Sequence, residues 1–89
     1  MKIVFNIAYG GFGLSDKALS MLGIEDEDDL ERTDPELVKV VETLGKEANG
    51  RCAKLLVFDM PENTTDYVID EYDGAETLYY VVDGKIRCY

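Results

Sequence analysis

The first stretch that could bind a ligand is a glycine-rich turn near the N-terminal end. It contains Tyr9, Gly10, Gly11, Phe12, Gly13 and Ser15. Backbone N–H groups of such a turn, followed by a helix, can hold an anion. The turn lacks the Gly-Lys-Ser/Thr of a Walker A loop and the third glycine of the dinucleotide fingerprint. A nucleotide-like ligand and a tight turn with Phe12 packed inside are therefore two open interpretations, and the residues favour the second.

A run of carboxylates is the second candidate site, and it comprises Glu25, Asp26, Glu27, Asp28, Asp29 and Glu31. Leu30 interrupts the alternating oxygen ligands that an EF-hand requires, so we predict no metal and no cofactor. Like charges repel one another, which indicates a solvated loop. Asp70, Glu71 and Asp73 extend the negative field, which could dock on a basic protein. A purely solubilising surface is the alternative.

Catalytic side chains are scarce in this sequence. The chain has no histidine, and its two cysteines, Cys52 and Cys88, do not form a C-x-x-C pair. Without histidine the chain can form no Ser-His or Cys-His pair, and histidine is the side chain that most often serves in general acid–base catalysis. We therefore predict a protein that is not an enzyme and whose cysteines are reduced and partly buried.

Composition narrows the classes of partner further. The 89 residues predict one domain, residues 1–89, with 19 acidic against 9 basic side chains and a net charge of -10. A surface this negative repels phosphate backbones and anionic lipids, so direct binding to nucleic acid or membranes is not expected. No apolar run reaches the roughly 20 residues of a membrane span, and residues 1–6 do not resemble a signal peptide. We expect a cytoplasmic protein.

Local signals predict two strands and two helices before residue 60. Residues 2–8 and 53–58 are rich in strand-forming residues. Ser15 is a suitable N-cap for a helix that ends at Gly23. Asp34 and Pro35 mark the start of a second helix, whose apolar stripe from Leu37 to Ala48 should pack on a sheet.

Two Asp-Gly pairs, at positions 73–74 and 83–84, predict a three-stranded meander joined by two-residue turns. Tyr72 should then pair with Ala75, and Val82 with Lys85. One face would carry Val68, Tyr72, Ala75, Tyr79, Val81, Ile86 and Cys88, and we expect the helices to cover it. The other would carry Tyr67, Ile69, Leu78, Tyr80, Arg87 and Tyr89, and its tyrosines Tyr67, Tyr80 and Tyr89 are expected at a partner or homodimer interface.

Together these elements predict an α+β fold, in which a small, mainly antiparallel sheet packs against two helices. The sheet would contain the N-terminal strand, the central strand and the C-terminal meander.

Three segments resemble a family of small uncharacterised bacteriophage and prophage proteins. They are the glycine-rich turn from Tyr9 to Ser15, the stretch from Asp34 to Arg51, and the segment Ile69-Asp70-Glu71-Tyr72-Asp73-Gly74. The resemblance covers most of the chain, but relatives are often longer between the two helices, and many end in a basic-aromatic tail that residues 86–89 match only loosely. The family has no established activity, so no site residue is carried over.

The resemblance implies a phage accessory protein that antagonises host defence, as anti-CRISPR proteins do. Its acidic surface would occupy the basic nucleic-acid groove of a host protein or nucleoprotein complex, such as a CRISPR effector. Two alternatives remain open: a binder that sequesters a nucleotide signal through the glycine-rich turn, and a homo-oligomeric structural phage protein.

Overall fold

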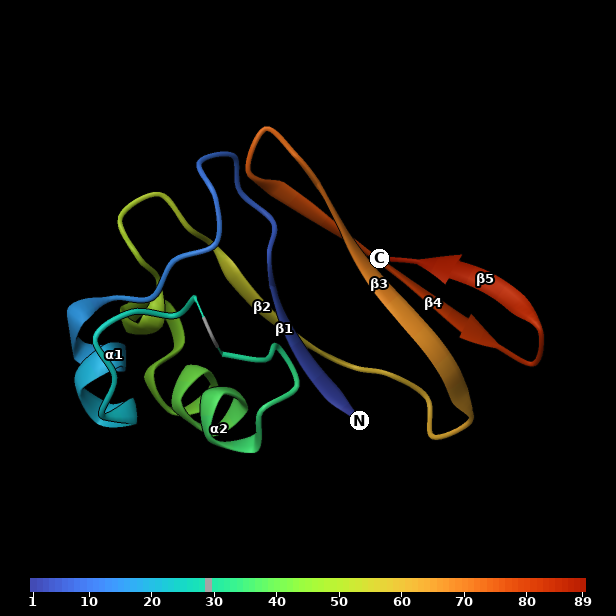
Figure 1. Cartoon of the computed structure of the whole chain (residues 1–89), viewed down its shortest axis with the longest axis horizontal. Helices are drawn as coiled ribbons and strands as arrows, with labels where there is room; N and C mark the ends of the chain where they lie inside the picture. Colours follow the sequence, from blue (N-terminus) through green and yellow to red (C-terminus); the bar gives the residue numbers. More distant parts are fainter. Residues whose placement is uncertain (29) are drawn as a thin grey trace.

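The computed structural model describes residues 1–28 and 30–89. Its elements, shown in Figure 1, are β1 (Lys2–Asn6), α1 (Asp16–Leu22), α2 (Pro35–Leu44), the 3-10 helix η1 (Gly45–Ala48), β2 (Leu55–Asp59), β3 (Thr64–Tyr72), β4 (Ala75–Val82) and β5 (Lys85–Cys88). This confirms the predicted α+β fold.

The strands form two separate antiparallel sheets. β1 pairs with β2 in a two-stranded ribbon, and β3, β4 and β5 form the predicted meander. The pairing is antiparallel as expected, but the N-terminal and central strands do not join the meander edge to edge. They pack against it face to face instead.

The ribbon is the middle of three layers (Figure 1). Val4 and Val57 pack with the helices in one core, whose buried members include Leu37 and Val41. On the opposite face of the ribbon, Ile3 and Phe5 pack with Met60 and with Leu78 of β4, and this second core contains partly buried Leu56, Phe58, Ile69 and Tyr80. Side chains alternate across a strand, so one short ribbon serves both cores.

Both predicted helix starts are confirmed. Ser15 Oγ accepts a hydrogen bond from the N–H of Ala18, and Asp34 Oδ1 accepts one from the N–H of Glu36. Gly23 ends α1 in the left-handed conformation, at a φ of 70°. These caps satisfy backbone groups that a helix end leaves unpaired.

The second helix is shorter than predicted. It ends at Leu44, because Gly45 adopts a φ of 57° and the chain continues as η1 to Ala48. Ala48 is nonetheless buried with the helical core, so the apolar stripe reaches its predicted end through a tighter turn. The first strands are also shorter than expected, since β1 ends at Asn6 and β2 begins at Leu55.

The register of the meander is confirmed, but the assignment of its faces is wrong. Tyr72 pairs with Ala75 and Val82 with Lys85, and both Asp-Gly turns have the positive φ values of hairpin turns. The face predicted as core is open: Tyr72 is 78% exposed and Ile86 75%. Leu78, on the opposite face, is fully buried. The reason is that the helices cover the ribbon, and the ribbon covers the face that carries Leu78.

Candidate functional site

Several exposed apolar side chains lie on the face of the meander that is turned away from the ribbon, which we call the outer face. Val68 pairs with Tyr79 across β3 and β4, and Val81 with Ile86 across β4 and β5. Val68 is 59% exposed and Tyr79 37%. We define the outer face as Asp66, Val68, Asp70, Tyr72, Tyr79, Val81, Ile86 and Cys88. Exposed apolar patches of this kind mark interaction sites in soluble proteins.

Two carboxylates lie on the outer face among its apolar side chains. Asp66 pairs with Val81 and Asp70 with Thr77, so both point to the same side as Val68. An open pocket of about 230 Å³ lies here, lined by Asp66, Tyr67, Val68, Tyr79, Val81 and Ile86. The outer face therefore combines an apolar strip with negative charge on its β3 side.

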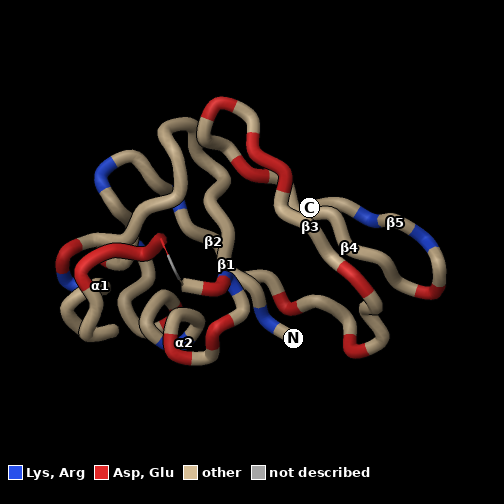
Figure 2. The backbone as a smooth tube through the Cα atoms, in the orientation of Figure 1, with Lys and Arg blue, Asp and Glu red and all other residues tan. Residues whose placement is uncertain are grey.

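The predicted acidic residues form two groups. Glu25, Asp26, Asp28 and Glu31 are exposed and Glu27 is half-buried, in the segment before α2, whereas Asp29 lies outside the described residues. Asp70, Glu71 and Asp73 are exposed at the β3–β4 hairpin end. Figure 2 shows the two groups well apart, one on the helical side of the molecule and one on the meander. The second group adjoins the outer face, because Asp70 lies on that face.

The three tyrosines predicted to bind a partner all lie at or near the ribbon side of the meander. Tyr80 is half-buried, and its ring centroid lies 5.3 Å from that of Phe58. The ring of Tyr89 also packs against Phe58, with 4.8 Å between the ring centroids, although the side chain of Tyr89 is 55% exposed. Tyr67 is 39% exposed. Tyr80 thus contributes to the second core and Tyr89 contacts Phe58 of that core, whereas Tyr67 lines the pocket on the outer face.

The glycine-rich turn packs against the β3–β4 hairpin. The N–H of Gly10 donates a hydrogen bond to the carbonyl of Asp73 at 3.4 Å, and a Cβ on Gly74 would collide with the Gly11 nitrogen. Tyr9 is exposed and Gly13 accepts a hydrogen bond from Gly50. Ser15 Oγ caps α1 and donates to the carbonyl of Glu47. These contacts favour a packing role for the turn over ligand binding.

A buried polar network lies beneath this turn. The guanidinium of Arg32 donates to both carboxylate oxygens of Glu76, at 2.7 and 2.8 Å, and lies 3.6 Å from the ring centroid of Phe12. Glu76 Oε1 also accepts the N–H of Asn6 at 2.8 Å. The side chain of Asn6, fully buried, bonds Ala8, Lys54 and Gly74. The network ties the ribbon, the hairpin and the loop before α2 together.

Sequence reasoning missed this network and placed the outer face in the core. Asn6 follows an uninterrupted apolar run, Ile3-Val4-Phe5, which is typical of a strand buried on both faces. That run was the available signal that the ribbon, and not the meander, is the covered layer.

Other predicted features can be placed as well. Cys52 and Cys88 are both free and exposed, which corrects the expectation of partly buried thiols. Among residues 1–28 and 30–89, no three Cys, Asp or Glu side chains are grouped to hold a metal ion. In the same part of the chain no helix has the length and apolar character to cross a membrane.

Comparisons with protein-family models, with curated proteins and with solved structures found no match to this chain. The resemblance to phage proteins therefore stays a prediction, and function has to be argued from the surfaces described above.

Proposed function

We propose that this protein acts without catalysis, by docking the outer face of its meander on a basic protein. The observation that carries the proposal is the placement of exposed Val68, Tyr72 and Ile86 on the same face as Asp66 and Asp70. Apolar contacts would supply affinity, and carboxylates would pair with Lys or Arg of the partner.

Charge favours a basic partner over a second copy of the chain. Self-association through the outer face would bring carboxylates of both copies to one interface, in a protein whose net charge is already -10. A positively charged surface removes that repulsion. The groove of a nucleic-acid-binding protein has this charge, because it normally faces phosphates.

The resemblance to phage proteins makes a host defence complex, such as a CRISPR effector, the specific partner class that we propose. In such a complex, carboxylates would occupy the positions of phosphates opposite Lys and Arg. Sequestration of a nucleotide is less well supported, because the glycine-rich turn is packed against the hairpin at Gly74.

The test is capture of partners from bacterial lysate by the tagged protein at low and high salt, followed by binding of the purified partner. We expect a basic protein whose retention falls with salt, since screening weakens charge pairing. Ile86→Lys should abolish this binding. Met21→Lys is the matched control, because Met21 is also an exposed apolar side chain, 51% accessible, but lies on α1. Equal retention by both variants would refute a role for the outer face.

A further inference from the structure

The strand β2 has one edge that is free to pair. The N–H of Ile7 donates a hydrogen bond to the carbonyl of Lys54, and the N–H of Met60 donates one to the carbonyl of Met1. In residues 54–60 the even-numbered residues therefore turn their backbone N–H and C=O groups toward β1. Odd-numbered residues turn theirs away. On that outer edge of β2, the N–H of Leu55 donates a hydrogen bond to Asn49 Oδ1 at 2.9 Å. Within the described residues, the N–H and C=O of Val57 have no hydrogen-bond partner.

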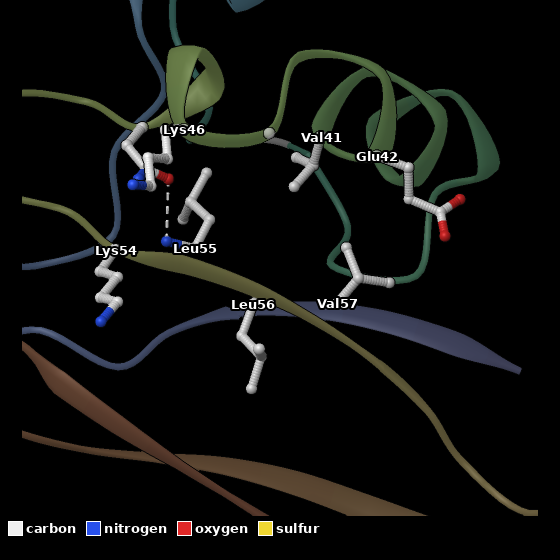
Figure 3. A pocket seen from close by; sticks show the side chains of 9 residues that line it. Val41, Glu42, Lys46, Lys54, Leu55, Leu56 and Val57 are labelled. Atoms are coloured by element: carbon white, nitrogen blue, oxygen red, sulfur yellow. Dashed lines mark hydrogen bonds between the residues drawn. The ribbon is translucent and has the colours of Figure 1, made fainter.

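A pocket of about 350 Å³ runs beside this free edge, between the end of α2 and β2. Figure 3 shows Val41 of α2 above Leu55 and Val57 of β2, so the pocket has apolar walls next to unpaired backbone groups. Gly45, where α2 ends, also lines the pocket. A groove between a helix and an edge strand is the geometry that proteins use to bind a peptide as an added strand.

Two of the three charged side chains that line this groove are positive, in contrast to the chain as a whole. Lys46 and Lys54 both line it, at the end opposite Glu42, and in Figure 3 Lys46 lies on the α2 side of β2 whereas Lys54 points away from α2. In the part of the chain that the structure describes, neither lysine makes an ion pair. Glu42 already forms an ion pair with Lys2, whose Nζ lies 2.8 Å from Glu42 Oε2, and this hydrogen bond raises the pKa of Lys2. The two lysines are therefore available to a carboxylate.

We propose that the groove between α2 and β2 binds an extended acidic peptide segment of a partner protein. The peptide backbone pairs with Val57, an apolar side chain enters the pocket beside Val41, and a glutamate or aspartate side chain pairs with Lys46 or with Lys54, which lie on the two sides of β2. This site is distinct from the outer face and takes a partner of the opposite charge, so it does not depend on the basic partner proposed above.

The probe is a set of acetylated and amidated octapeptides in which valine and threonine alternate around one central glutamate, with a lysine peptide as its counterpart. Binding is followed by amide chemical shifts and by hydrogen exchange of the full chain. We expect the glutamate peptide to shift the amide signals of Leu55 and Val57 and to slow exchange at Val57, because that N–H gains a partner. The lysine peptide should bind at least about tenfold more weakly.

Charge-reversed proteins separate this site from general attraction. Lys46→Glu combined with Lys54→Glu should remove binding of the glutamate peptide, whereas Lys39→Glu, an exposed lysine of α2 outside the groove, should lower it only slightly. Equal binding of the two peptides, or no change at Val57 at millimolar glutamate peptide, would overturn the proposal. Concentration-dependent shifts at Val57 without any peptide would also overturn it, since the occupant would then be a second copy of this chain.

Discussion

Arg32 and Glu76 lie 44 positions apart in the chain and join through two parallel hydrogen bonds, Nη1 to Oε1 and Nη2 to Oε2. The carbonyl of Arg32 also accepts the N–H of Val4, at 2.9 Å. Arg32, in the loop before α2, is thereby bound both to the ribbon and to β4. The pair joins the loop before α2, the ribbon and the meander at one point.

Replacement of Glu76 by alanine should lower the free energy of unfolding by about 3 kcal/mol, because the half-buried guanidinium of Arg32 and the N–H of Asn6 both lose their acceptor. Urea unfolding followed by circular dichroism measures this change. Glu62→Ala, at an exposed position with no ion pair among the described residues, is the control and should stay within about 0.5 kcal/mol. Equal losses in the two variants would contradict a structural role for the pair.

Asn6→Ala should cost about 3 kcal/mol of unfolding free energy, since it removes the partners of the Ala8 and Lys54 N–H groups and of the Gly74 carbonyl. The comparison is Asn63→Ala, which removes one exposed hydrogen bond to Asp83 and should cost less than about 1 kcal/mol. Thermal or urea unfolding of both variants gives the difference. A similar cost for the two would mean that the network around Asn6 adds little stability.

Gly74 and Gly84 form a matched pair for the packing of the glycine-rich turn. Both have positive φ values, 89° and 75°, in equivalent hairpin turns. A Cβ at Gly84 meets nothing within 4 Å, whereas at Gly74 it meets the backbone of Gly10 and Gly11. Gly84→Ala should cost about 1 kcal/mol from backbone strain alone, and Gly74→Ala at least about 2 kcal/mol more. Urea unfolding measures the free energy of unfolding of both variants. Equal values would mean that the contact of Gly74 with Gly10 and Gly11 adds no stability.

The two faces of the meander should respond differently to truncation. Leu78→Ala removes a fully buried side chain and should cost about 3 kcal/mol, while Ile86→Ala, at a side chain 75% exposed, should stay within about 0.5 kcal/mol. Chemical unfolding of each variant measures both values. The reverse order would restore the face assignment that the sequence suggested.

Short-range features of this protein follow from the sequence because their causes lie within a few residues. Ser15 and Asp34 start their helices by bonding N–H groups two or three residues onward. The Asp-Gly pairs bend each hairpin because they tolerate positive φ, and the two-residue turn sets the pairing of Tyr72 with Ala75. The α+β class and the register of the meander could therefore be predicted.

The tertiary structure alone decided which layers meet. Alternation along β4 separates Leu78 from Tyr79 but does not say which of the two is covered, because both faces carry apolar side chains. The face that carries Leu78 is buried because Ile3 and Phe5 of the β1–β2 ribbon pack against it. The contact of Arg32 with Glu76 and the free edge of β2 beside Lys46 and Lys54 also depend on how distant segments pack, and no local propensity encodes that packing.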